Sequence, residues 1–128
     1  MNNILIADDE PHVLRVLKLS LEKEGYQVDV CANGREALAA IQSKPPDVLI
    51  TDIQMPLMDG EELCRTIQQT MPGREFLIFV LTSRTEIEHR EWSRAISNLQ
   101  FLEKPVSIRE LTEKLASNRA SITASLQS

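Results

Sequence analysis

The sequence predicts an α/β domain, in which a single doubly wound sheet of five parallel strands is covered by helices on both faces in three α/β/α layers. Short apolar runs alternate with amphipathic segments along the 128 residues, as expected of strand–helix units with right-handed crossovers. Two of these runs, VLI at Val48–Ile50 and FLIFVL at Phe76–Leu81, are continuous rather than alternating. Continuous apolar runs are typical of parallel strands that are covered on both faces.

The expected elements of the first half alternate regularly. The first strand, Asn3–Ala7, is an apolar run, and the first helix, Pro11–Glu24, places Leu14, Leu17 and Leu21 on one stripe. Proline suits the first turn of that helix. The next elements are a strand at Gln27–Ala32, a helix at Gly34–Ser43 and a strand at Asp47–Thr51.

The second half continues the alternation. In the last expected helix, Ile108, Leu111 and Leu115 share one stripe. The four glycines and the segments SKPPD and MPG lie at element boundaries, where they punctuate the pattern. The elements of this half are a helix at Gly60–Thr70, a strand at Phe76–Leu81, a helix at Thr85–Ser97, a strand at Gln100–Glu103 and a helix at Ser107–Ser117.

The composition is that of an ordinary soluble domain. The chain is 42% hydrophobic and 26% charged, and its length suits one domain with a real core. The net charge is −5, and no basic stripe is present that would neutralise phosphates, so direct nucleic-acid binding is not expected. This balance better suits metal ions or partners with positive patches.

Cysteine usage and hydropathy indicate a cytoplasmic protein. Cys31 and Cys64 lie in separate apolar segments without a CxxC motif, which predicts buried, reduced thiols rather than a disulfide or a zinc site. No charged segment precedes the first apolar run, and no run approaches 18 apolar residues. Neither export nor a membrane span is therefore expected.

Polar and charged side chains follow four of the five expected strands. In an open parallel sheet, ligands bind at the carboxyl ends of the strands. If the first, third, fourth and fifth strands lie side by side, the groups at their ends share one rim. These groups are Asp8 and Asp9 after the first strand, Asp52 after the third, Thr82 and Ser83 after the fourth, and Lys104 after the fifth.

Such a rim holds the groups needed for phosphoryl transfer to a carboxylate. Two unit charges about 4 Å apart repel by about 4 kcal/mol at an effective dielectric near 20, and a divalent cation relieves this repulsion. Mg²⁺ takes one or two carboxylates together with phosphate oxygens. Lys104 would supply a fixed positive charge, Thr82 a hydroxyl donor, and Asp52 a nucleophile that becomes an aspartyl-phosphate.

Each of these residues also has a purely structural interpretation. Asp8 or Asp9 could cap the first helix, and Asp52 could start a turn. Thr82 could cap the fourth helix, and Lys104 could be a solvated residue at a strand end. The occurrence of such residues at four strand ends favours a common site.

Four motifs make the sequence resemble the receiver domain of two-component response regulators. They are ADDE after the first strand, DIQMPLMDG after the third, LTS after the fourth and FLEKP before the last helix. The resemblance extends from about Asn2 to Ser117. It implies a flavodoxin-like fold with strand order 2-1-3-4-5, a receiver domain over residues 1–118, and a C-terminal tail or helix extension over residues 119–128.

The resemblance implies a set of metal ligands around the phosphoacceptor. Asp52 is the implied phosphoacceptor and a ligand of Mg²⁺ or Mn²⁺. Asp9 is an implied direct ligand, and Asp8 acts on the metal mainly through water. The backbone carbonyl of Gln54 completes the ligands that the protein supplies.

The resemblance also implies a set of switch residues. Thr82 is the hydroxyl that moves to the phosphoryl group, with the small Ser83 beside it. Lys104 pairs with the phosphate, and Phe101 is the aromatic side chain that turns inward when Thr82 moves. Pro105 follows a peptide bond that is usually cis in this family.

The chain departs from the family pattern before the fifth strand. It reads Ile96-Ser97-Asn98 where the family often has Ala-Gly-Ala, so Asn98 is expected to take the left-handed conformation. Trp92, in the bulky fourth helix, is expected to be half-buried packing. The departures concern partner choice rather than phosphorylation. No role is implied for His12 or His89.

The implied function is a phosphorylation-activated switch. A sensor histidine kinase or a phosphotransfer protein would phosphorylate Asp52, and a downstream protein or output domain would bind the face of the fourth helix, fifth strand and fifth helix. A phosphorylation-dependent homodimer is a further implied partner. The domain would catalyse only its own phosphorylation and dephosphorylation, so it is not expected to be an enzyme.

Two other functions remain as alternatives. One is a receiver-like binding module that acts without phosphorylation. The other is a phosphatase with an aspartyl intermediate, although Gln54 stands where such enzymes often need a second acid. In a receiver, Gln54 and Arg84 would flank the path of the hydrolytic water, and Arg84 is expected to hold the phosphate and prolong its lifetime.

Overall fold

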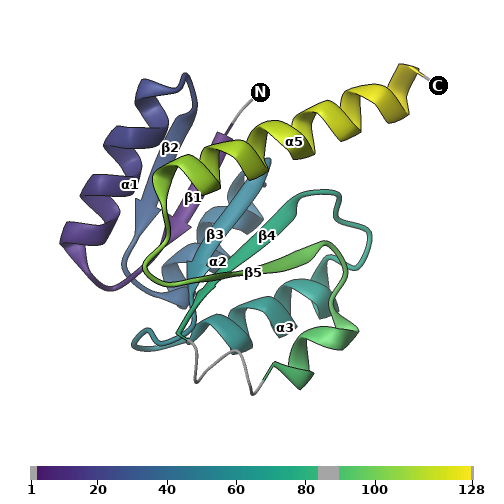
Figure 1. Ribbon diagram of the computed structural model, residues 1–128. Helices are drawn as coiled ribbons and strands as arrows, with labels where there is room; N and C mark the ends of the chain where they lie inside the picture. The colour runs from purple at the N-terminus through teal and green to yellow at the C-terminus, as the bar shows by residue number, and fades with distance from the viewer. Residues whose placement is uncertain (1–2, 84–89, 128) are drawn as a thin grey trace.

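The computed structural model describes residues 3–83 and 90–127 and confirms the predicted fold class (Figure 1). Five parallel strands form one sheet in the order β2-β1-β3-β4-β5, which is the order that the family resemblance implied. The strands are β1 (Asn3–Ala7), β2 (Gln27–Cys31), β3 (Val48–Asp52), β4 (Leu77–Thr82) and β5 (Leu99–Glu103).

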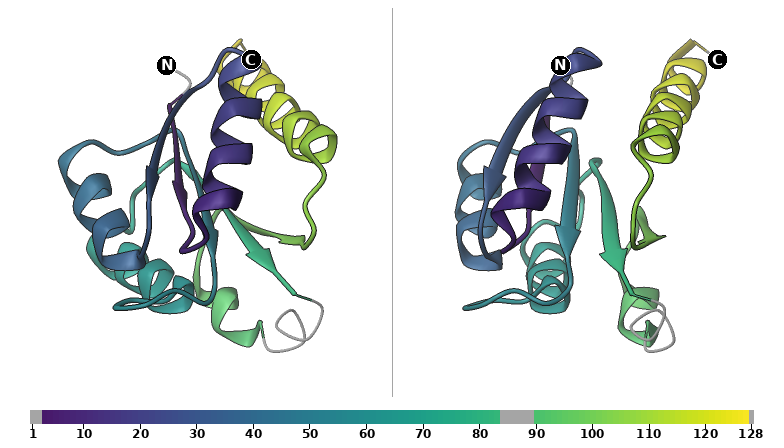
Figure 2. Two further views of the ribbon diagram at one scale, coloured as in Figure 1. Left: turned by 90° about the vertical axis from the view of Figure 1, so that its left-hand side faces the viewer. Right: turned by 60° about the vertical axis from the view of Figure 1, so that its left-hand side comes forward.

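Helices cover both faces of this sheet. Figure 2 shows α1 and α5 on one side and α2 and α3 on the other. The helical elements are α1 (Pro11–Lys23), α2 (Gly34–Ser43), α3 (Gly60–Thr70), the short 3₁₀ helix η1 (Glu91–Ala95) and α5 (Ile108–Gln127). No helix in the described ranges is both long enough and apolar enough to cross a lipid bilayer.

The fourth helix differs from the expectation. Where an α-helix was predicted over Thr85–Ser97, the described part of that range holds only η1, with hydrogen bonds between residues three apart. Most helical stability comes from packing an amphipathic face. Trp92 and Ile96 are the only bulky apolar residues in this part, and Ile96 already has an extended backbone.

The turn after η1 has the predicted left-handed residue. Asn98 has φ of 51°, and its carbonyl oxygen accepts a hydrogen bond from the Ile78 amide at 2.9 Å. A buried guanidinium adds to this turn, because Arg74 donates to the carbonyl oxygens of Phe76 and Ser97. The end of η1 is therefore tied to the beginning of β4.

Several other element boundaries shift by one or a few residues. β3 and β4 each start and end one residue later than expected, because Asp52 and Thr82 still pair with the neighbouring strands. β2 ends one residue earlier and β5 begins one residue earlier. α5 continues to Gln127 rather than ending at Ser117, and it projects beyond the sheet (Figure 1).

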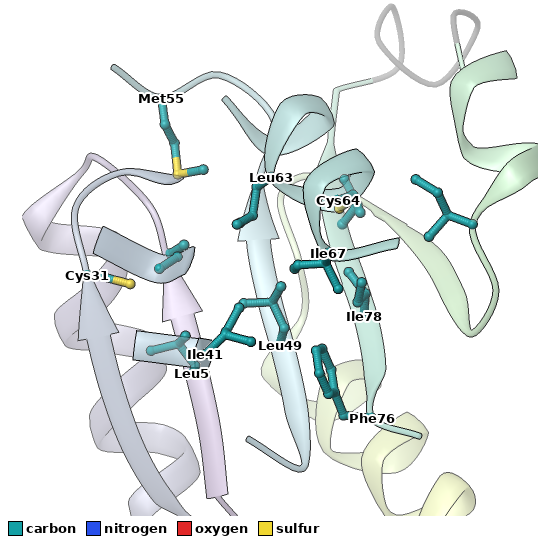
Figure 3. Close-up of a cluster of buried hydrophobic side chains, with 14 residues drawn as sticks. Leu5, Cys31, Ile41, Leu49, Met55, Leu63, Cys64, Ile67, Phe76 and Ile78 are labelled. Atoms are coloured by element: carbon teal, nitrogen blue, oxygen red, sulfur yellow. The ribbon is translucent and has the colours of Figure 1, made fainter. Parts of the chain in front are cut away.

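The sheet separates two hydrophobic cores. The core under α1 and α5 includes Leu17 and Leu21 of α1 and Leu111 and Leu115 of α5, as the predicted stripes require. The opposite core lies under α2 and α3 and is shown in Figure 3. Ile78 of β4 belongs to this second core and is fully buried. β3 and β4 are buried at every position, as their continuous apolar runs predicted.

Both cysteines are buried free thiols, as predicted. Cys31 and Cys64 belong to the core drawn in Figure 3, and burial raises the pKa of each thiol to about 12. A thiol whose pKa lies near 12 remains protonated at neutral and mildly alkaline pH, and only the thiolate reacts readily with electrophiles.

We therefore expect both cysteines to resist alkylation in the native protein. At pH 8, a maleimide should react with Cys31 and Cys64 at least tenfold more slowly than in the urea-unfolded chain, as intact-protein mass spectrometry would measure. Rapid native labelling of either residue would contradict the burial described above.

Candidate functional site

The strand order brings the predicted site residues to one edge of the sheet. β1, β3, β4 and β5 are consecutive neighbours, so the residues at or directly after their carboxyl ends lie close together. A pocket of about 340 Å³ opens at this edge. The residues that line it are Asp9, Glu10, Asp52, Gln54, Ser83 and Lys104.

Three carboxylates converge at the pocket. One oxygen each from Asp8, Asp9 and Asp52 lie within 4.8 Å of one another. Asp8 and Asp52 are buried, whereas Asp9 is exposed. Hard divalent cations such as Mg²⁺ prefer oxygen ligands of this type. The cluster therefore has the chemistry of a metal site.

Asp8 carries an unusual buried oxygen. Its Oδ1 accepts a hydrogen bond from the Glu10 amide at 2.9 Å, but its Oδ2 is buried and has no hydrogen-bond partner among the described residues. Burial raises the pKa of Asp8, and the nearby charge of Asp52 adds to this effect, while the Glu10 amide and Lys104 oppose it. An unpartnered carboxylate oxygen beside two further carboxylates fits a cation, or water bound to a cation.

The structure also bears on the capping alternative for this segment. The N-cap residue of α1 is Glu10, whose side chain makes no capping hydrogen bond. Asp8 receives the amide of Glu10, which precedes the helix, rather than an amide of the first turn. The buried position of Asp8 is therefore not explained by capping.

Asp52 and Lys104 form the most direct contact of the site. Lys104 Nζ lies 2.7 Å from Asp52 Oδ1, and the amide of Ile53 donates to the same oxygen at 2.8 Å. The Asp52 side chain is only 5% exposed, whereas that of Lys104 is 36% exposed. The backbone amide of Lys104 donates to the Thr82 carbonyl at 2.8 Å, and its bond to Pro105 is cis.

The predicted switch residues differ in their exposure to the pocket. Ser83 lines the pocket, whereas Thr82 is fully buried and its hydroxyl donates to the Ser83 carbonyl at 3.0 Å. Phe101 is half-buried on β5 and contacts Trp92 edge to face, with ring centroids 5.8 Å apart. The half-buried packing expected for Trp92 is confirmed.

Comparison with known proteins identifies the family of this chain. Residues 4–116 match the model of the response regulator receiver domain. The chain belongs to the response regulator receiver family. Among relatives, the response regulator MprA of Mycolicibacterium vanbaalenii is 37% identical over 112 residues, which are 88% of this chain and 48% of that protein. The chain thus spans about half the length of the curated relatives it matches.

Solved receiver structures have the same fold. The chemotaxis protein CheY4 of Vibrio cholerae has a TM-score of 0.81 and 31% identity, with 91% of this chain and 98% of that chain covered. A CheY-like receiver domain protein of Methanospirillum hungatei has a TM-score of 0.82 and 32% identity, with 92% and 93% covered.

Two polar residues of this receiver domain were not predicted from the sequence. Glu10 lines the pocket, and Thr51 places its hydroxyl 2.9 Å from the carbonyl oxygen of Asp52. The continuous acidic run could have suggested Glu10, whereas Thr51 reads as an ordinary strand residue. His12 is exposed, and Arg84 and His89 lie outside the described residues.

Proposed function

We propose that this receiver domain is a phosphorylation-activated switch in which Asp52 accepts the phosphoryl group. The observation that carries the proposal is the meeting of Lys104 and Asp52 at 2.7 Å beside the carboxylates of Asp8 and Asp9. This combination supplies a nucleophile, a fixed cation and a set of metal ligands in one pocket.

The proposed reaction is a direct transfer between side chains. One oxygen of Asp52 attacks the phosphorus of a phosphohistidine on the donor protein. The P–N bond breaks as the new P–O bond forms, and the electron pair leaves on the imidazole nitrogen. Because the Ile53 amide and Lys104 both bind Oδ1, we assign Oδ2 as the attacking oxygen.

Lys104 and the carboxylate cluster have different electrostatic roles in the proposed reaction. Lys104 is positioned to bind an oxygen of the phosphoryl group once that group forms on Asp52. Mg²⁺ or Mn²⁺ would be held by Asp9, Asp52 and the carbonyl of Gln54, with Asp8 acting through water. When bound, the metal neutralises charge between the carboxylates and the phosphoryl oxygens.

Phosphorylation would change the partner face through Thr82. The phosphoryl group adds roughly one further negative charge and strong acceptor oxygens. The Thr82 hydroxyl, which donates to a neutral carbonyl in this structure, would gain a charge-assisted partner by moving. To reverse a 1:99 equilibrium between two states requires about 5.5 kcal/mol of differential stabilisation.

The face that would respond contains an aromatic pair. Phe101 is the proposed aromatic switch, and its contact with Trp92 links that switch to η1. Trp92 is the only tryptophan of the chain, so its fluorescence is a natural reporter of the change. The proposed binding surface for a downstream protein, an output domain or a second copy is formed by η1, β5 and α5.

The proposed role does not include turnover of an external substrate. A sensor histidine kinase or a phosphotransfer protein would donate the phosphoryl group, and the domain would catalyse only its own phosphorylation and dephosphorylation. Signalling of this kind between a kinase and a regulator suits a cytoplasmic location.

The proposal is tested by locating a covalent phosphate. Incubation with a small acyl phosphate or phosphoramidate and Mg²⁺ should add one phosphate, and peptide mapping by mass spectrometry should place it on Asp52. Hydroxylamine and base should remove it, as expected of an acyl phosphate. A phosphate on Ser83 or His12, or one stable to hydroxylamine, would overturn the assignment.

We also expect weak Mg²⁺ binding at the carboxylates. NMR titration with millimolar Mg²⁺ should shift the amide signals around Asp8, Asp9 and Asp52, because the cation relieves their mutual repulsion. The amide of Asp29, which lies on the edge strand β2, should not shift. Equal shifts at both places, or none at the cluster, would contradict a metal site.

A further inference from the structure

The peptide group between Asp52 and Ile53 is held at both of its ends. Its N–H, on Ile53, donates to Asp52 Oδ1 at 2.8 Å. Its carbonyl oxygen, on Asp52, accepts a hydrogen bond from Thr51 Oγ1 at 2.9 Å. A peptide group is planar, so the directions of its N–H and its C=O are linked. The Thr51 hydroxyl therefore contacts the same rigid unit that orients the carboxylate.

The packing around this peptide group is close. A Cβ atom on Gly60 would lie 2.2 Å from the Asp52 carbonyl oxygen, so only glycine permits the observed approach. The Gly60 amide also donates to the Ile53 carbonyl at 2.7 Å. Thr51 itself is fully buried. Rotation of the peptide group in this setting would break contacts on both sides.

We propose that Thr51 is a positioning residue for the acceptor carboxylate. Its hydroxyl fixes the Asp52–Ile53 peptide group, whose N–H then holds Oδ1 together with Lys104. The assigned attacking oxygen, Oδ2, is thereby set in one orientation. This inference rests on the proposed role of Asp52 as phosphoacceptor. Loss of the hydroxyl removes one of the contacts that hold the peptide group, so a small tilt weakens the hydrogen bond from the Ile53 amide to Oδ1 and the carboxylate samples unproductive orientations.

The inference is tested with three variants of the whole chain. Thr51→Val keeps a similar shape but removes the hydroxyl, and Thr51→Ser keeps the hydroxyl. Thr66→Val is the matched control, because Thr66 donates its hydroxyl to the Glu62 carbonyl at 2.8 Å within α3, away from the pocket. The first readout is the rate of Asp52 labelling by a small acyl phosphate in excess Mg²⁺. The second is the NMR signal of the Ile53 amide in metal-free protein.

We expect Thr51→Val to label roughly tenfold more slowly, because small misplacements of reacting groups cost large factors in rate. Thr51→Ser and Thr66→Val should stay within about twofold of the parent protein. The Ile53 amide proton should move upfield in Thr51→Val, since it loses its carboxylate acceptor, and stay in place in Thr51→Ser. Labelling of folded Thr51→Val at the parent rate, or an unchanged Ile53 amide signal, would overturn the proposal.

The amide readout separates this inference from the proposed function. If the parent protein is not labelled on Asp52, the proposed function fails, while the Ile53 signal still shows whether Thr51 orients the carboxylate. If Thr51→Val does not fold, hydrogen exchange of the Ile53 amide in the parent protein tests the inference instead. An Ile53 amide that exchanges as fast as an unprotected loop amide would contradict the hydrogen bond on which the inference rests.

Discussion

Replacing Asp52 with asparagine is expected to abolish covalent phosphorylation. Asparagine has nearly the same shape, but its amide lacks the negative charge and the nucleophilic oxygen that form an acyl phosphate. The substitution also leaves Lys104 without the carboxylate that it contacts at 2.7 Å. Labelling with a small acyl phosphate in Mg²⁺, followed by intact-protein mass spectrometry, measures the effect directly.

A matched control separates this loss from a general effect of charge. Asp29→Asn removes one negative charge from an exposed position of edge strand β2 and should label like the parent protein.

Mg²⁺ binding should change as well, because Asp52→Asn removes one of the three converging carboxylates and should weaken the affinity for the metal. A phosphate that persists undiminished in Asp52→Asn would show that another residue is the acceptor.

The fold was predictable because its signals are local and repeated. The continuous runs of β3 and β4 are buried at every position, and the leucine stripes of α1 face one core. The left-handed conformation of Asn98 followed from a missing glycine. The end-of-strand residues met because parallel strands deliver their carboxyl ends to one edge.

The features that were missed depend on tertiary contacts. η1 replaces the expected α-helix in the described residues because too few apolar residues there can pack against the sheet. Arg74 reads as a solvated loop residue, yet it is buried and bonded to the carbonyls of Phe76 and Ser97. The role of Thr51 depends on the direction of a single peptide group, which no residue pattern records.

The sequence predicted which residues form the site better than it predicted how each of them is placed. Every strand-end residue predicted from the sequence lies at the same edge of the sheet, but their environments differ. Asp8 has a buried oxygen without a partner among the described residues, and Asp9 is exposed. Thr82 is fully buried, whereas its neighbour Ser83 lines the pocket. These differences depend on where each strand ends relative to its neighbours.

Replacing Lys104 with methionine is expected to slow phosphorylation of Asp52 by roughly 10- to 100-fold, or about 1.4 to 2.7 kcal/mol in the barrier. Methionine keeps an unbranched apolar stem but removes the ammonium that would bind the phosphoryl oxygens. The upper figure applies to a donor shielded from water, and the 36% exposure of the Lys104 side chain reduces the effect because solvent and salt screen its charge. Lys44→Met, at the exposed C-cap of α2, is the matched control and should not change the rate.

Metal binding by the same variant should change in the opposite direction. In the parent protein, Lys104 donates a hydrogen bond to Asp52 Oδ1, and its positive charge partly neutralises the negative charge of the three carboxylates. Without it, their repulsion increases, so Mg²⁺ should bind more tightly and raise the melting temperature more than it does in the parent protein. Slower labelling together with tighter Mg²⁺ binding is not the result of misfolding, because a disordered site would lose both. Unchanged labelling and unchanged metal affinity would show that the contact between Lys104 and Asp52 has no part in the reaction.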